Sequence, residues 1–196
     1  MLIELELDLQ DLIDGLNDLD KIALLLLHAN NDAPIRGELF YQTEIFLISN
    51  YILEIKDQAD FMPGWLGPYS ESAEVSLNNL ISYTLVDKNR SCGGYKLNNK
   101  GKEIAKILEG STLPEYKDAI SNFKDLLNDL TKDELLAFIY FSFHYFTGES
   151  LILPEVVKKR MPSIISLYRK GKISLAKAAS LSGMCIEDFL DVLKEH

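Results

Sequence analysis

The stretch Tyr83–Leu97, YTLVDKNRSCGGYKL, decides the fold of the first half of the chain. Residues Tyr83 to Asp87 favour a strand, two adjacent glycines follow shortly after, and Tyr95–Leu97 can return as a second strand. The pattern therefore predicts a β-hairpin with Asn89–Gly94 at its tip.

Two helices are predicted well before this hairpin. The first begins at a cap formed by Asn17 or Asp18, and its apolar run Ile22–Leu27 indicates burial on most faces. The second begins with Pro34 at its first position, where a missing N–H costs no helical hydrogen bond, and runs to about Leu53.

A loop and a third helix complete the approach to the hairpin. The loop contains turn-forming and acidic residues, namely Asp57, Asp60, Pro63 and Gly64. The third helix is capped by Ser70 or Ser72 and runs to about Ser82, with buried positions expected at Val75, Leu77, Leu80 and Ile81. A further helix follows the hairpin, and we expect Phe46, Leu80 and Ile104 to share one core.

The N-terminal extension has two readings. Residues 3–9 alternate apolar and polar side chains, which is typical of a strand, whereas the leucines from Leu5 to Leu19 also recur at helical spacing. We favour a short strand at about residues 2–7, followed by a helical turn to Gly15.

Three helices followed by a two-stranded hairpin is the element order of a winged helix-turn-helix. The chain resembles archaeal and bacterial winged-helix proteins over residues 19–108, including PadR-like and MarR-like regulators and SocA-like antitoxins. The segments that carry the resemblance are Gln42–Asn50, Leu66–Glu71, Asn79–Ile81 and Tyr95–Ala105. The resemblance implies a DNA-binding domain and regulation of transcription in a prokaryote.

Candidate DNA-binding residues lie on and beside the predicted hairpin. Basic side chains there can contact phosphates: Lys88, Arg90, Lys96, Lys100 and Lys102. The third helix adds side chains that can read base edges, namely Ser72, Asn78 and Asn79. Glu71 and Glu74 on that helix repel phosphate, and a charged turn can equally serve solubility alone.

The chain changes character after Ser111. An amphipathic seam spans residues 113–130 in a helix that Pro114 can begin, and Thr131–Glu134 forms a capping box that opens a helix from Lys132 to about Phe146. Later breaks and starts are expected at Pro154, Met161–Pro162 and Gly171.

The last residues, Leu167–His196, predict two short helices joined by a turn at Gly183, the first capped by Ser174. This tail resembles the C-terminal helix-turn-helix of small prokaryotic antitoxins that pair with PIN-domain ribonuclease toxins. Carboxylates at residues 187, 188, 191 and 195 make its second helix a poor reader of DNA. We therefore favour packing of this unit on the protein's own body or on a partner, with partner-binding candidates Phe189, Leu190 and Leu193.

The net charge of −10 argues against indiscriminate nucleic-acid binding, but the charges are segregated. Residues 1–20 contain acids and no base, whereas residues 88–102 and 158–177 contain bases and no acid. Cys92 and Cys185 form no paired motif, which fits a reducing compartment, and the apolar runs are too short to cross a membrane. We therefore expect a cytoplasmic protein.

Motifs for catalysis, metals or nucleotide cofactors are missing from the sequence, and the three histidines are isolated. We therefore predict a mainly α protein that is not an enzyme and has no catalytic residues, metal or cofactor. Residues 1–110 form the winged-helix domain and residues 111–196 a helical domain. The expected function is DNA-binding regulation by a protein that binds double-stranded DNA. The alternative is an antitoxin-like module that forms a homodimer or binds a toxin or another protein through residues 113–130 or 167–196.

Overall fold

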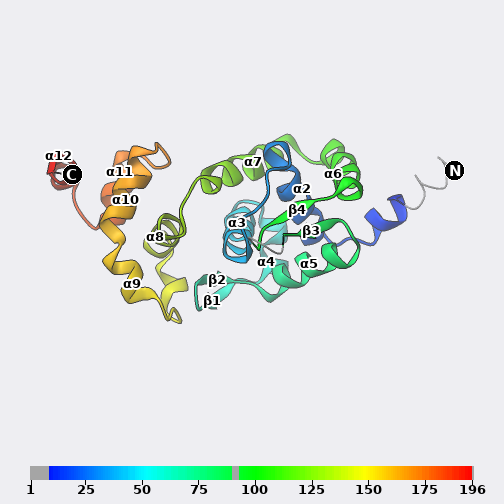
Figure 1. The fold of residues 1–196 in the computed structure, drawn as a ribbon, viewed down its shortest axis with the longest axis horizontal. Coiled ribbons are helices and arrows are strands. Elements are labelled where there is room, and N and C mark those ends of the chain that lie inside the picture. Colours follow the sequence, from blue (N-terminus) through cyan, green and yellow to red (C-terminus); the bar gives the residue numbers. More distant parts are fainter. Residues whose placement is uncertain (1–8, 90–92, 196) are drawn as a thin grey trace. The chain divides into compact units, whose positions relative to one another are not determined.

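The chain is mainly α-helical and divides into two compact units in this computed structural model, which describes residues 9–89 and 93–195 (Figure 1). Unit 1 comprises Met1–Phe61 and Ser70–Asn128, and unit 2 comprises Met62–Tyr69 and Asp129–His196. The predicted fold class is confirmed at the level of a mainly α chain. The strand expected at residues 2–7 lies outside the described residues, whereas residues 9–14 are helical before Gly15.

Unit 1 is organised around its long second helix. Its elements are α2 (Asp18–Asp32), α3 (Glu38–Tyr51), η1 (Leu53–Ile55), α4 (Lys56–Ala59), α5 (Glu71–Ser82), β3 (Val86–Lys88), β4 (Tyr95–Leu97), α6 (Asn99–Ser111) and α7 (Pro114–Asn128). α5, α6, α7 and β4 all pack against α2 (Figure 1), whose residues 22–27 are buried as predicted. Phe46, Leu80 and Ile104 are buried in the same unit, also as predicted.

Reciprocal capping begins α2. The Asn17 side chain accepts a hydrogen bond from the Asp20 amide at 2.8 Å, and the Asp20 side chain accepts one from the Asn17 amide at 3.3 Å. Asn17 is therefore the cap, one of the two residues expected. Regular helix stops at Ala29, after which three residues adopt the left-handed conformation: Asn30, Asn31 and Asp32.

The predicted start of α3 at Pro34 is wrong. Ile35 instead pairs with Tyr95 in an isolated antiparallel bridge, with both backbone N–O distances at 2.9 Å. Gly37, with φ of 110°, then turns the chain into α3 at Glu38. Pairing with a distant strand thus outweighs the local preference of Pro34 for a helix start.

The loop predicted after α3 contains regular structure. α4 is followed by β1 (Met62–Gly64), which pairs antiparallel with β2 (Gly67–Tyr69). Pro63 lies directly opposite Pro68, and a two-stranded sheet tolerates both because each strand has a free edge. The β1–β2 hairpin belongs to unit 2.

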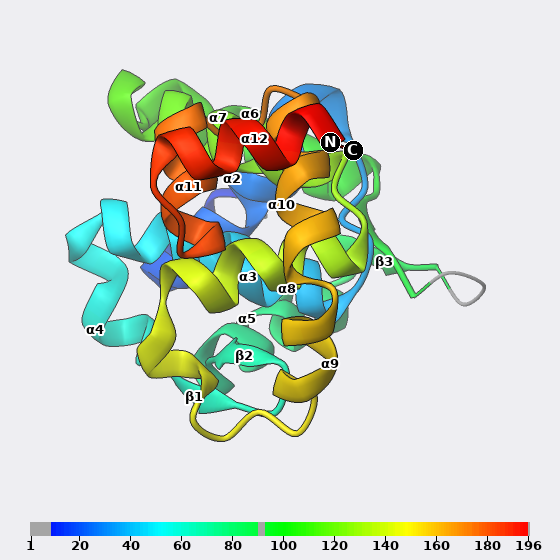
Figure 2. The same cartoon turned by 90° about the vertical axis from the view of Figure 1, so that its left-hand side faces the viewer.

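The decisive hairpin is confirmed. β3 pairs antiparallel with β4, Val86 lies opposite Leu97, and Figure 2 shows β3 leading away from the helices of unit 1. Two backbone hydrogen bonds of 2.8 Å join Asn89 to Gly93 and to Gly94. Residues 90–92 of the expected tip lie outside the described residues.

Glycine is required where α6 meets the hairpin. Asn98 caps α6 by accepting a hydrogen bond from the Gly101 amide at 3.0 Å, and its own amide group donates to the Thr84 carbonyl at 2.6 Å. A β-carbon at residue 101 would overlap the backbone carbonyl of Leu85. The glycine therefore lets α6 lie directly against the start of the hairpin.

Unit 2 is organised around its first helix. Besides β1 and β2, its elements are α8 (Lys132–Ser142), η2 (His144–Thr147), α9 (Leu153–Lys158), α10 (Arg160–Arg169), α11 (Leu175–Ser182) and α12 (Ile186–Glu195). The capping box of Thr131 and Glu134 opens α8 as predicted. This helix was expected to reach Phe146 but ends at Ser142, and η2 begins two residues later at His144.

The division into units differs from the predicted boundary at residue 110. That boundary rested on the change of sequence pattern at Ser111, but α7 packs against α2 and α3 and so lies in unit 1. Within residues 9–89 and 93–195, every helix is too short or too polar to cross a membrane.

Candidate nucleic-acid interface

Side chains of α3 fix the first turn of α5. Ser70 is the cap, and its hydroxyl accepts a hydrogen bond from the Ala73 amide at 2.9 Å. The Gln42 side chain makes two hydrogen bonds of 3.0 Å with the Ser70 backbone, and the Tyr41 hydroxyl donates to the Ala73 carbonyl at 3.1 Å. These buried contacts set the direction of α5 within unit 1.

The predicted reading residues lie on the outer side of α5. Ser72 and Asn78 are exposed, and Asn79 is half-buried. Val75 was expected in the core but is 50% exposed, because it lies on the same side as Ser72. The first two turns of the helix also carry its acids, Glu71 and Glu74.

The lysines on the hairpin strands are exposed. Lys96 lies directly opposite Asp87, and both side chains face solvent, so part of the positive charge is offset by a neighbouring carboxylate. The Lys88 ammonium lies 5.5 Å from the centre of the buried Tyr95 ring. Arg90 lies outside the described residues.

The two lysines of α6 differ in their surroundings. The Lys102 ammonium lies 3.0 Å from the Asp32 carboxylate, whereas Lys100 is half-buried at the start of the helix. Partial burial alone would raise the pKa of Asp32, but His28 and Lys102 both bind its carboxylate and hold that pKa below its usual value. Lys102 is thus tied to the end of α2.

Within unit 1, the described residues bring together exposed lysines and a helix with exposed hydroxyl and amide groups. Ammonium groups bind phosphate without regard to sequence, and asparagine side chains can pair with base edges. The first turn of α5 also carries Glu71 and Glu74, whose charges would weaken any contact with a phosphate backbone.

The tail forms the predicted pair of helices. Ser174 caps α11, Gly183 ends it in the left-handed conformation with φ of 75°, and α12 lies alongside α11 (Figure 2). Phe189 is fully buried and its ring meets the Tyr168 ring edge-on at 6.1 Å. Leu190 remains 38% exposed. Phe189 therefore belongs to the core of unit 2, and the partner-binding prediction depends on Leu190 and the half-buried Leu193.

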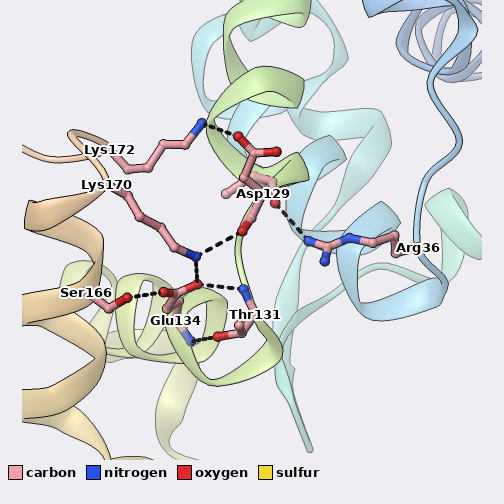
Figure 3. Close-up of polar contacts among 8 residues, drawn as sticks. Arg36, Asp129, Thr131, Glu134, Ser166, Lys170 and Lys172 are labelled. Atoms are coloured by element: carbon pink, nitrogen blue, oxygen red, sulfur yellow. Dashed lines mark hydrogen bonds and ion pairs between the residues drawn. The ribbon is translucent and has the colours of Figure 1, made fainter.

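A polar cluster attaches α10 to the start of α8 (Figure 3). The Glu134 carboxylate accepts hydrogen bonds from the Thr131 amide at 2.6 Å, the Ser166 hydroxyl at 2.5 Å and the Lys170 ammonium at 2.7 Å. Burial alone would raise the pKa of Glu134, but these donors hold it below its usual value. Lys170 belongs to the basic segment identified in the sequence, but its ammonium group is bound to Glu134 within unit 2.

Other bases of residues 158–177 are also bound within unit 2. Lys159 lies 2.8 Å from the Asp133 carboxylate. The Arg160 guanidinium donates to the Leu181 carbonyl at 2.7 Å and lies 4.1 Å above the Phe141 ring. This segment therefore offers less free positive charge than its composition indicates.

Sequence reasoning missed a buried ionisable pair in unit 1. Lys124 of α7 is fully buried, and its ammonium donates to the carbonyls of Leu26, Leu27 and Ala29 at 2.8, 3.1 and 2.8 Å. Glu44 of α3 is also fully buried, and neither carboxylate oxygen has a hydrogen-bond partner among the described residues. Lys124 recurs four residues after Ile120 on the buried side of α7, and this spacing was the available signal.

This pair predicts a pH-dependent stability. Burial raises the pKa of Glu44 to about 8, against the attraction of Lys124 and Arg36. A carboxyl with a raised pKa in the folded chain stabilises that chain fully below its ordinary pKa of 4.5 and loses this contribution as pH rises through about 8. Relative to Glu44→Gln, the unfolding free energy of the wild type should fall by up to about 1.4 kcal/mol per pH unit between pH 5 and 8.

Urea denaturation at several pH values measures this difference. The exposed Glu38 of the same helix supplies the matched control, since Glu38→Gln should show little pH-dependent difference from the wild type. A flat difference for Glu44→Gln across this range would contradict a protonated buried Glu44. Burial also lowers the pKa of Lys124, to about 8, so its own effect belongs to higher pH.

Comparison with known proteins adds one finding. Residues 156–196 match the model of an uncharacterised protein family, UPF0175. The matched segment includes α10, α11 and α12, all in unit 2. No curated protein and no solved structure matches the chain. The tail is therefore similar to a known family, and its antitoxin character stays a prediction.

Proposed function

We propose that unit 1 is a winged helix that binds double-stranded DNA, and that the protein regulates transcription in a prokaryote. The observation that carries this proposal is a hairpin with two exposed lysines, Lys88 and Lys96. The hairpin follows α5, whose first turn is held by hydrogen bonds from α3. In this arrangement the hairpin contacts the phosphate backbone as a wing, and α5 lies toward a groove.

The proposal assigns most of the affinity to the hairpin. α5 contributes neutral groups such as Ser72 and Asn78 but also acids, so its contribution to affinity is small and its role is selectivity. Lys102 contributes less than its charge indicates, because Asp32 already binds it.

Replacing Lys88, Arg90 and Lys96 together with Ala should weaken DNA binding on every sequence. Each lost phosphate contact removes about 0.9 of a released counterion, so the slope of log K against log salt should flatten by two to three units, a rough estimate. Gel-shift titrations at a series of salt concentrations measure this slope.

A matched control is Lys159→Ala with Lys172→Ala, which removes lysines of unit 2 that are paired with Asp133 and Asp129. This control should leave the salt slope unchanged. An unchanged slope in the triple hairpin variant would show that the hairpin is not the contact.

The alternative function is that of an antitoxin-like interaction module with little or no DNA binding. It is favoured by the family match over residues 156–196 and by the exposed apolar side chains Ile186 and Leu190 on α12. The flanking acids Glu187, Asp188 and Asp191 suit a basic partner surface, and a toxin or a second copy of the chain are the candidates.

A single variant separates the two functions. Ile186→Asp with Leu190→Asp should leave DNA binding unchanged if unit 1 is the DNA-binding domain. Loss of DNA binding in this variant, with the fold intact, would show that α12 rather than unit 1 contacts DNA.

A further inference from the structure

Unit 1 contains a pocket of about 470 Å³ at the end of α2, between α6 and α7. Leu25 and Ile120 contribute apolar surface to it. Its polar lining includes His28, Asn30, Asn31, Glu109, Asp118 and Ser121. None of the DNA-contact candidates lines this pocket, so it is separate from the proposed interface.

The backbone at the pocket edge is left-handed. Asn30, Asn31 and Asp32 are consecutive and have φ values of 55°, 57° and 57°. Asn and Asp adopt this conformation more readily than other non-glycine residues. The Asn30 side chain is held on α7 by the Ser121 hydroxyl, which donates to it at 2.6 Å.

The pocket is rich in hydrogen-bond acceptors. The Nδ1 atom of His28 lies 2.6 Å from the Asp32 carboxylate, and its Nε2 atom lies 3.8 Å from the Glu109 carboxylate. Asp118 adds a carboxylate that makes no ion pair within the described part of the chain.

The lining also contains one lysine, Lys117. The Lys117 ammonium donates to the Glu109 backbone carbonyl at 3.2 Å, at the end of α6. A ligand with N–H donors and a positive charge would pair with the Glu109 and Asp118 carboxylates, while its carbon chain covers Leu25 and Ile120.

The pocket is connected to the hairpin through a short segment. Asp32 binds His28 at the pocket and Lys102 on α6. Ile35, three residues later, pairs with Tyr95 of β4 through two backbone hydrogen bonds. A shift of the left-handed turn therefore reaches the base of the hairpin through direct contacts.

We propose that this pocket binds a small organic cation, an ammonium or guanidinium compound, and that the segment Asn30–Ile35 transmits its binding to the β3–β4 hairpin. The regulatory meaning of this site rests on the proposed DNA binding by the hairpin. The binding itself does not, because its test uses no DNA.

The probe is agmatine, which carries a guanidinium and an amine, titrated into the ¹⁵N-labelled full chain at constant ionic strength. The amide NMR signals of Asn30, Asn31 and Ser121 should shift and saturate, and those of Tyr95 and Lys96 should follow the same curve. Glu109→Gln with Asp118→Asn should raise the Kd at least tenfold. Both side chains are exposed, so the fold should survive.

The matched control is Glu187→Gln with Asp188→Asn, which removes the same charges from the exposed start of α12. It should leave the Kd unchanged. Shifts that do not saturate, or that weaken equally in both double variants, would show non-specific attraction to an acidic chain and overturn the site. Saturation at the pocket without shifts at Tyr95 and Lys96 would overturn the transmission.

Discussion

Lys124→Met should lower the unfolding free energy of unit 1 by about 3–5 kcal/mol, the cost of leaving three carbonyls of one helix end without their shared ammonium donor. The methionine keeps most of the side-chain volume but donates no hydrogen bond. The carbonyls of Leu26, Leu27 and Ala29 of α2 would lose their shared donor at the point where the helix ends.

 The Glu44 carboxyl would also lose the attraction of the Lys124 charge, which works against the rise of its pKa.

Chemical denaturation followed by far-UV circular dichroism measures the loss, and amide exchange in α2 and α7 shows that it belongs to unit 1. The control is Lys117→Met on the same helix, because the Lys117 ammonium makes a single exposed hydrogen bond and its loss should cost less than about 1 kcal/mol. Equal effects of the two variants would contradict the role given to Lys124.

Phe189→Asp should detach α12 from unit 2. The Phe189 ring is fully buried against Tyr168, and truncating a buried phenylalanine costs about 3–5 kcal/mol before the burial of a carboxylate is counted. Amide exchange across residues 186–195 should become fast, and the thermal midpoint of unit 2 should fall.

Leu190→Asp is the matched control for this change, since Leu190 is the next residue on the same helix and is 38% exposed. It should leave amide exchange in α12 nearly unchanged. If Phe189→Asp and Leu190→Asp had the same effect, α12 would not be held by Phe189.

Much of the fold could be predicted from the sequence where local chemistry decides it. The predicted caps Asn17, Ser70, Thr131 and Ser174 each accept a hydrogen bond from an amide in the first turn of the helix that they begin. The signal is therefore contained in a few neighbouring residues. The hairpin at Val86–Leu97 is similarly local, because its turn and both strands lie in one short segment.

The wrong predictions concern contacts between distant segments. Pro34 did not begin α3, because Ile35 pairs with Tyr95 far along the chain. The β1–β2 hairpin was missed because both strands contain proline and are very short. Val75 was placed in the core because its apolar side chain, rather than its position on the helix, decided the assignment.

The candidate sites were predictable to different degrees. Exposure of Lys96 followed from its alternation with the buried Tyr95 and Leu97, whereas exposure of Lys88, on the same face as those residues, did not. The ion pair of Lys102 with Asp32 depends on packing that no local pattern records. The pocket at the end of α2 requires three helices to meet, and its left-handed turn is marked only by the residue types Asn30 and Asn31, which tolerate that conformation.

Hydrogen–deuterium exchange of the full chain tests the central claim most directly, when it is measured with and without a DNA duplex from the region upstream of the gene that encodes the protein. DNA binding by unit 1 predicts slower exchange in α5 and in the β3–β4 strands, with α12 unchanged. Protection confined to α12, Ile186–Glu195, or no protection anywhere at low salt, would contradict DNA binding by the winged helix.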